Sequence, residues 1–368
     1  MALIVGLPIS VNYVSGRLIF KRSQKMWIIF INVIKVLAFL ISMHSVSKII
    51  LSPLVQMALH ACIFGGFAIN MITVIKRKQI NTSLHNVTKL SRIVNPNIPI
   101  GNTFIKWLLL MHYFALAIFV AFMTSFFFYQ EWDNFRESEA FPFVTLHSNY
   151  DLCATVVFFS IIFSFCISSN ICGTMLLVCD STYITLSNII KAYGKNLKTR
   201  FRSGDFDRKS LTAETEMLNI ITEQVEMADS ALNMCAIMLY GMFVCMFYIT
   251  VSIGFSKEES FKTKMVIGYI AWNFILAISL FRRLTMSGSS VNTESEHLKD
   301  VSVECFRSII SSCADEPTLL AFSLLFGSIQ DTNLVVTGGR IFVIERSLYL
   351  TVAGTMVTYG VIIFQTNE

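Results

Sequence analysis

A stripe of polar side chains runs along the last hydrophobic stretch of the chain, which extends from Ile341 to Gln365. Its members follow one another at alternating steps of four and three residues: Thr351, Thr355, Thr358, Ile362 and Gln365. This spacing places them on one face of a helix. From Ser347 onward the stretch is uncharged and long enough to cross a bilayer. Because lipid offers no partner for hydroxyl and amide groups, the stripe predicts contact with water or with another helix.

A second group combines aromatic rings with a hydrogen-bonding amide in the outer halves of other hydrophobic stretches. Its members are Tyr129, Trp132, Tyr248, Tyr269, Trp272 and Asn273. Together they could bind a small polar or aromatic ligand by stacking and hydrogen bonding. The alternative is an aromatic belt at the membrane interface, which explains Trp132 well and Tyr269 in part. Trp272 and Asn273 lie about two helical turns inside their stretch, too deep for such a belt.

The sequence offers no catalytic or metal-binding arrangement. Its six histidines are scattered, and the nine cysteines form no C-x-x-C pair or cluster with metal-ligand spacing. No H-E-x-x-H, G-x-S-x-G or phosphate-loop pattern is present. We therefore expect a protein that is not an enzyme and that needs neither a metal nor a cofactor.

Composition predicts a membrane protein with several spans. Of 368 residues, 54% are hydrophobic and 14% are charged, with a mean hydropathy of +0.62. A soluble domain carries about 25% charged residues. The net charge of +5 is small and unevenly distributed, so it does not indicate nucleic-acid binding.

Seven apolar blocks are each long enough to cross a bilayer as a helix. They are Met26–Val46, Leu54–Ile75, about Phe104–Phe128, about Tyr150–Val178, Met234–Phe255, Met265–Phe281 and the final stretch. Backbone polar groups must pair within the segment in lipid, so an all-α fold follows. Within the first block, Lys35 either contributes to a ligand or ion path or extends along a partly buried face toward the interface.

Charge distribution orients these spans. Twenty-three Lys and Arg residues fall on the side of the N-terminus and five on the other, with Lys35 inside the first span. The positive-inside rule then predicts a cytoplasmic N-terminus and an extracellular C-terminus. This orientation is opposite to that of a G-protein-coupled receptor. It also leaves the glycosylation sequons at Asn81 and Asn86 in the cytoplasm and unmodified.

The two longest cytoplasmic segments are predicted to be helical. Apolar residues recur at three and four between Leu211 and Leu239, which indicates a helix that runs into the fifth span. Residues Ser181–Lys198 continue the fourth span and His297–Cys313 the sixth in the same way. The apolar run Thr318–Ile329 is too short to span and predicts an amphipathic or buried helix before the seventh span.

The C-terminus resembles a known family. Thr358-Tyr359, the five residues Gly360–Phe364 and then Gln365 are similar to the TYhhhhhQF signature of insect gustatory receptors, in which h is hydrophobic. Length, seven spans, a cytoplasmic N-terminus and long inner extensions of spans four to six agree with that family. Two positions depart from the signature, because Gly360 stands at the first h and Thr366 at the final Phe.

The resemblance implies a plasma-membrane cation channel (Na⁺, K⁺, Ca²⁺) opened by a small-molecule tastant. Four identical or different subunits would surround one pore lined by their seventh helices, and a cytoplasmic anchor domain would hold them together. The gate would lie at Gln365 and the following position. With Thr366 in place of Phe, Phe364 or Ile362 could narrow the closed pore instead.

The chain divides accordingly into five parts, by residue number 1–179, 180–233, 234–283, 284–340 and 341–368. They hold the N-terminal segment with spans one to four, the anchor extensions of helices four and five, spans five and six, the remaining anchor with a short pre-pore helix, and the pore-lining helix. Two alternative functions stay open. One is an odorant-receptor-type channel with a more apolar pocket. The other is an inverted-topology transporter, although the two halves show no repeat.

Overall fold

The computed structural model describes residues 22–46, 53–96, 150–204, 207–254, 264–311 and 315–366. It also describes seven helical positions between Trp107 and Ala121, which belong to the expected third span. The predicted ligand residue Tyr129 lies outside the described residues. For Tyr269, Tyr359, Ile362, Phe364 and Thr366 the helical backbone is described but the side chain is not.

The first described helices are α1 (Arg22–Val46), α2 (Pro53–Ile75) and α3 (Arg77–Val94). Helices α1 and α2 coincide with the first two expected spans. α1 presents large apolar side chains outward, as a lipid-facing helix does: Phe30, Val33, Val36, Leu37 and Leu40. Helix α3 follows α2 after the single residue Lys76 and is bent away from it by 73°. The hydrophobic blocks do not predict this helix, because polar residues dominate its composition.

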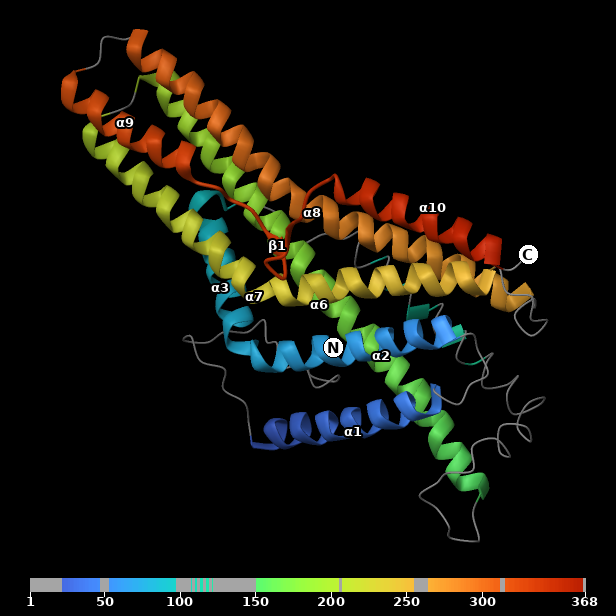
Figure 1. Ribbon diagram of the computed structural model, residues 1–368. Helices are drawn as coiled ribbons and strands as arrows, with labels where there is room; N and C mark the ends of the chain where they lie inside the picture. The colour runs from blue at the N-terminus through green and yellow to red at the C-terminus, as the bar shows by residue number, and fades with distance from the viewer. Residues whose placement is uncertain are drawn as a thin grey trace.

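Three long helices organise the molecule: α6 (Tyr150–Ser203), α7 (Arg208–Gly254) and α8 (Lys264–Ser311). Each contains an expected span and continues without interruption into a bundle at one end of the molecule (Figure 1). The apolar positions predicted to share one face of α7 are all buried: Leu218, Ile221, Val225, Ala228 and Leu232. Within the described side chains, Arg208–Ser252 by itself is long and apolar enough to span a membrane.

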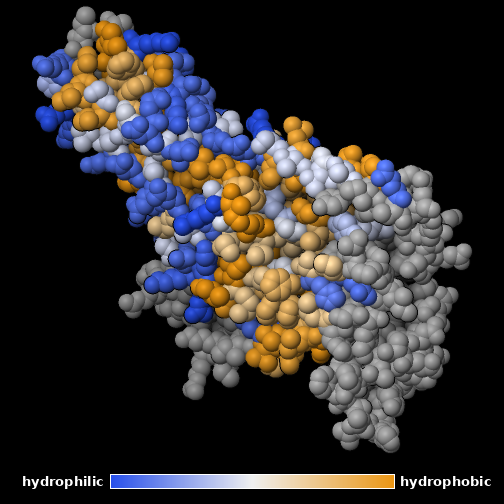
Figure 2. All heavy atoms as spheres, viewed as in Figure 1, coloured by the Kyte–Doolittle hydropathy of each residue, from blue (hydrophilic) through white to orange (hydrophobic). Residues whose placement is uncertain are grey.

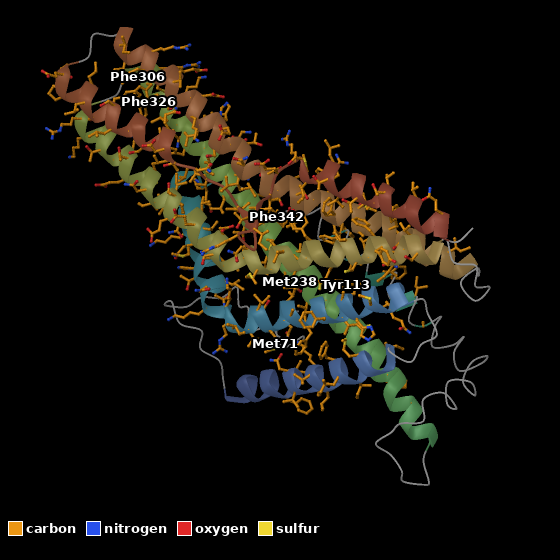
Figure 3. All side chains as sticks on the ribbon, in the orientation of Figure 1. Met71, Tyr113, Met238, Phe306, Phe326 and Phe342 are labelled. Carbon is orange, nitrogen blue, oxygen red and sulfur yellow. The ribbon has the colours of Figure 1, made fainter. Side chains whose placement is uncertain are left out.

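Helix α9 (Glu316–Asp331) packs on α7 and α8 in this bundle. Its Phe322 and Phe326 meet Phe306 of α8 in stacked pairs with ring centroids 5.9 and 4.9 Å apart (Figure 3). The bundle surface is largely hydrophilic in Figure 2, with an apolar patch at its far end. Exposed leucines of α9 are Leu319, Leu320 and Leu324.

The last hydrophobic stretch is shorter as a helix than the sequence predicted. Strands β1 (Thr337–Gly338) and β2 (Phe342–Val343) pair antiparallel, and helix α10 (Leu348–Thr366) begins only after them. Gly339 and Arg340 have φ of 61° and 60°, a left-handed conformation that turns the chain back on itself. The expectation of a helix from Ile341 is therefore wrong for its first seven residues, 341–347.

A close helix-to-hairpin contact fixes this turn on α8. A Cβ built on Gly288 would lie 2.6 Å from Ile344, whose side chain is fully buried. Only a residue without a side chain lets the hairpin come this close.

We predict that Gly288→Ala destabilises the protein by about 1–3 kcal/mol, the usual cost of forcing an extra methyl group into a packed interior. Thermal unfolding in detergent micelles measures the effect. Gly241→Ala on α7 is the matched control, because its added Cβ would meet nothing within 4 Å. Equal midpoints for the two variants would contradict the contact.

Candidate functional site

Among its described side chains, helix α10 packs against the rest of the chain along one face. That face consists of Leu348, Tyr349, Val352 and Met356, which contact the core formed by α7 and α8. In Figure 1 the helix runs beside the half of α8 that lies away from α9 and the extended bundle. The other α10 residues whose burial is described are all exposed.

The predicted polar stripe lies on this open surface. Thr351, Thr355, Thr358 and Gln365 are all exposed. Each threonine hydroxyl donates to a carbonyl one turn earlier, for example Thr355 Oγ1 to the Thr351 oxygen at 2.8 Å. With its hydrogen directed into the helix, each hydroxyl presents oxygen lone pairs outward. Such a row of acceptors suits water and partly dehydrated cations.

A third face of α10 is apolar and also exposed. It carries Leu350, which is 80% exposed, together with Val357 and Val361. At about 100° per residue, the packed, hydroxyl and apolar faces are separated by roughly a third of a turn each. A single helix therefore offers one face to its own chain and two different faces to other surroundings.

Aromatic side chains fix the first turn of α10. The Tyr349 hydroxyl donates to the Arg282 carbonyl of α8, and its ring meets Phe281 edge-on at 5.5 Å. Tyr240 of α7 contacts Phe281 of α8 and also Phe342 of β2, which is labelled in Figure 3. We call Tyr240, Phe281, Phe342 and Tyr349 the α10 junction. It joins α7, α8, the hairpin and α10 at one place.

The hairpin is fastened to α7 by hydrogen bonds. Asp229 accepts from the Thr337 backbone N–H at 2.6 Å and from its hydroxyl at 2.9 Å. The Gly339 N–H donates to the Asn233 carbonyl at 2.9 Å. Because α10 begins a few residues later, a movement of α7 must carry the start of α10 with it. The sequence does not predict a role for Asp229 or Tyr349. Asp229 is one of several acidic residues on α7, and no pattern distinguishes it from the others.

An ion pair links α8 to α6 beside the junction. Arg283 Nε donates to Asp180 Oδ1 at 2.9 Å, and the Asp180 carboxyl is almost fully buried. Burial raises the pKa of Asp180 above its usual value, while the Arg283 guanidinium acts in the opposite direction. Consecutive residues of α8 thus bind α6 through Arg283 and α10 through the carbonyl of Arg282.

Of the predicted ligand residues, Tyr248 lies near the end of α7, and Tyr269, Trp272 and Asn273 lie near the start of α8. Ring contacts pair Tyr240 with Phe281 and Phe247 with Phe274, and these pairs define how the antiparallel helices α7 and α8 are aligned along their length. In this register Tyr248 lies level with Asn273, and Ser252 lies level with position 269. The structure thus brings Tyr248, Trp272 and Asn273 to one level, all half-buried.

Two buried polar atoms in this region lack partners among the described residues. They are Nε1 of Trp272 and Oγ of Ser252. A buried donor without an acceptor costs about 1–3 kcal/mol, and a bound ligand can supply the missing group. Ser252 was not among the residues predicted from sequence, because a lone serine in an apolar block gives no signal.

Lys35 is buried between helices and does not extend to the interface. It is 4% exposed, and its Nζ donates to Asn70 Oδ1 of α2 at 2.9 Å. Asn70 in turn donates to Asn32 Oδ1 at 3.3 Å. The expectation that Lys35 extends toward the interface is therefore wrong. The lysine instead forms a polar link between α1 and α2.

Comparison with known proteins places the chain in a family. A family model described as 7tm chemosensory receptor matches residues 2–367. The chain therefore belongs to the seven-transmembrane chemosensory receptors, as the C-terminal signature predicted. A search of curated proteins found no match.

Solved structures of an insect receptor share the fold. The olfactory receptor OR5 from Machilis hrabei in complex with eugenol has a TM-score of 0.70 at 13% identity, covering 99% of this chain and 95% of that one. A second structure of OR5 gives 0.69 at 12% identity with the same coverage. At such low identity the likeness shows the all-helical, seven-transmembrane fold alone.

We predict that Asp229→Ala loosens the hairpin, because the Thr337 N–H loses its acceptor at a cost of about 1–3 kcal/mol. Hydrogen–deuterium exchange should show clearly faster exchange of the amides in 337–344, with little change in α6. Thr337→Val is the control, since it removes the hydroxyl bonds but keeps the backbone bond to Asp229, and it should have a smaller effect. Unchanged hairpin exchange in Asp229→Ala would rule out this attachment.

Proposed function

We propose that this protein is a gustatory receptor subunit that forms, with three others, a cation channel opened by a small-molecule tastant. The pore would be lined by the hydroxyl face of α10 from each subunit. The observation that carries this proposal is the division of α10 into a packed face, an exposed row of threonines and an exposed apolar face. Around a central axis, the threonines would face water and the apolar face the next subunit or lipid.

Two further features support assembly from several copies. The leucines of α9 that are exposed in the single chain lie at the far end of the bundle, where an anchor domain would join subunits. Ile341 in the hairpin is 76% exposed in the same way. Apolar side chains of this size are costly in water, and contact between subunits would bury them. The four subunits could be identical or drawn from related receptors.

The orientation of the proposed channel follows from charge. Basic residues favour a cytoplasmic N-terminus, which puts α3, α9 and the bundle in the cytoplasm and Gln365 at the outer mouth. The side chain of Asn81, in one of two glycosylation sequons, is buried in the fold. A glycan could not be attached to this side chain in the folded chain. This agrees with a receptor in the plasma membrane whose α3 lies on the cytoplasmic side.

Opening would begin at the outer ends of α7 and α8. A tastant that accepts from Trp272 Nε1 would stabilise one relative position of these helices. The α10 junction and the Asp229 attachment would then transmit the movement of α7 and α8 to the start of α10. The tastant must bind the open state more tightly than the closed state, since otherwise it shifts no population.

The gate would lie toward the outer end of α10. Gln365 is exposed there, and Ile362, Phe364 and Thr366 occupy the neighbouring helical positions. An apolar ring formed by Ile362 or Phe364 could exclude water from the closed pore. The chemistry of the site requires no cofactor and no bond making or breaking, so we propose a receptor and not an enzyme.

A second candidate is an odorant-receptor-type channel. It is favoured by the structural likeness to OR5, one of whose structures is a complex with eugenol. The Thr-Tyr and Gln of the C-terminal signature favour the gustatory type. A transporter is the third possibility, and the size of the current separates it from both channels.

Ligand-evoked currents test the proposal directly. Cells that express the full chain should pass cation currents, too large for stoichiometric transport, in response to members of a panel of sugars, alkaloids, phenolics and volatile odorants. We predict that Trp272→Ala raises the half-maximal agonist concentration by roughly 5- to 100-fold, the equivalent of one buried polar contact. Trp107→Ala removes the same ring from an exposed position and should leave the response unchanged.

Surface labelling must show equal expression of the wild type and both variants. A wild-type response in Trp272→Ala would exclude the proposed ligand site. Absence of current with every compound, alone and together with related receptors, would contradict the channel itself.

A further inference from the structure

Helix α3 lies across the direction of the membrane helices. It follows α2, the second expected span, after one residue and at an angle of 73° (Figure 1). If α2 runs near the membrane normal, as spans do within about 20°, α3 lies close to the plane of the bilayer. Its first residue, Arg77, is separated from the end of the span by Lys76 alone. The helix therefore sits at the height of the lipid headgroups.

One face of α3 holds it on the protein. Ile80, Val87 and Leu90 are buried against α6 and α7. At the bend, Lys76 Nζ donates to the Ser230 carbonyl of α7 at 2.6 Å. Asn86 contacts Met227 of the same helix, Nδ2 to Sδ at 3.6 Å. These contacts determine which face of α3 points away from the protein.

The outward face of α3 is a row of basic residues. Lys78, Lys89 and Arg92 are spaced by eleven and three residues, which places them on one helical stripe opposite the buried face. All three are exposed, and α3 contains no Asp or Glu. Within the described residues, no ion pair joins any of the three to a carboxylate, including Glu223 and Glu226 on the adjoining α7.

Exposed apolar residues accompany the basic row. Ile75 at the end of α2 is 75% exposed, and Ile93 in the last turn of α3 is 60% exposed. Apolar side chains next to basic ones are typical of helices at the boundary between headgroups and acyl chains. In water these isoleucines would be unfavourable; at a lipid surface they are not.

We propose that α3 is a binding surface for anionic phospholipid headgroups of the inner leaflet. Lys78, Lys89 and Arg92 bind the lipid phosphates, and Ile75 and Ile93 contact the acyl chains. Polybasic surfaces directly beside a membrane span attract such lipids. Because α3 also contacts α6 and α7, a bound lipid can change the position of the helices that lead to the α10 junction. The inference rests on the orientation in the proposed function, which places α3 at the cytoplasmic leaflet.

Lipid binding can be measured without an agonist or a current. Purified full-length protein in neutral detergent is titrated into a fluorescent short-chain phosphatidylinositol bisphosphate, and binding is followed by anisotropy. Lys78→Gln, Lys89→Gln and Arg92→Gln together should weaken binding at least tenfold, since each basic residue contributes about fivefold at a membrane surface. Lys89→Gln alone should weaken it about fivefold and serves if the triple variant does not fold.

The matched control removes the same charges far from the membrane. Lys195→Gln, Arg208→Gln and Lys209→Gln change exposed residues of α6 and α7 in the extended bundle and should alter binding less than twofold. Soluble inositol trisphosphate separates a lipid site from a site for free phosphates, and it should compete only weakly.

Equal loss in both triple variants, no binding by the wild type, or binding of inositol trisphosphate as tight as that of the lipid would each overturn the proposal. None of these results depends on whether the channel conducts. Failure of the lipid-site proposal can therefore be distinguished from failure of the proposed function.

Discussion

The threonine face of α10 needs a polar neighbour, and most of the architecture can be understood from this requirement. Each hydroxyl hydrogen is already directed to the helix backbone, so what remains outward is a row of oxygen acceptors. Lipid cannot satisfy them, and the chain's own helices cover the opposite side of α10. In the proposed channel, several copies arranged around water would provide the missing environment without altering the fold of any one of them.

The long helices give α10 a firm base. α7 and α8 run continuously from the level of Tyr248 and Trp272 to the far end of the bundle, and the hairpin is attached to α7 through Asp229. Helices are stiff along their axis, so a displacement at the outer end reaches the junction with little loss. Residues Arg282 and Arg283 place the contacts with α10 and α6 side by side on α8. A channel opened by a ligand needs such a connection between the site and the pore.

Hydrophobic block length was sufficient to predict the spans, since α1, α2 and the membrane halves of α6, α7 and α8 follow it closely. The buried face of α7 followed from three-four periodicity. Helix α3 could also have been predicted, because Ile80, Leu84, Val87 and Leu90 repeat at three and four, but polar residues dominate its composition.

The hairpin at 337–343 could not be predicted from the sequence, because two short strands leave no periodicity and Ile341 to Val343 resemble the start of a span. Contacts between distant segments, such as Lys35 with Asn70 and Asp229 with Thr337, carry no local signal.

Cysteine substitution along α10 tests the central claim most directly. Single cysteines at Thr351, Thr355, Thr358, Leu350 and Val357 are exposed to a charged thiol reagent during agonist application, while the cation current is recorded. If the hydroxyl face lines the pore, the three threonine positions react in the open state and the current changes irreversibly. Leu350 and Val357, on the apolar face, do not respond. Modification at the apolar positions instead, or at all five alike, would contradict a pore lined by this face of α10.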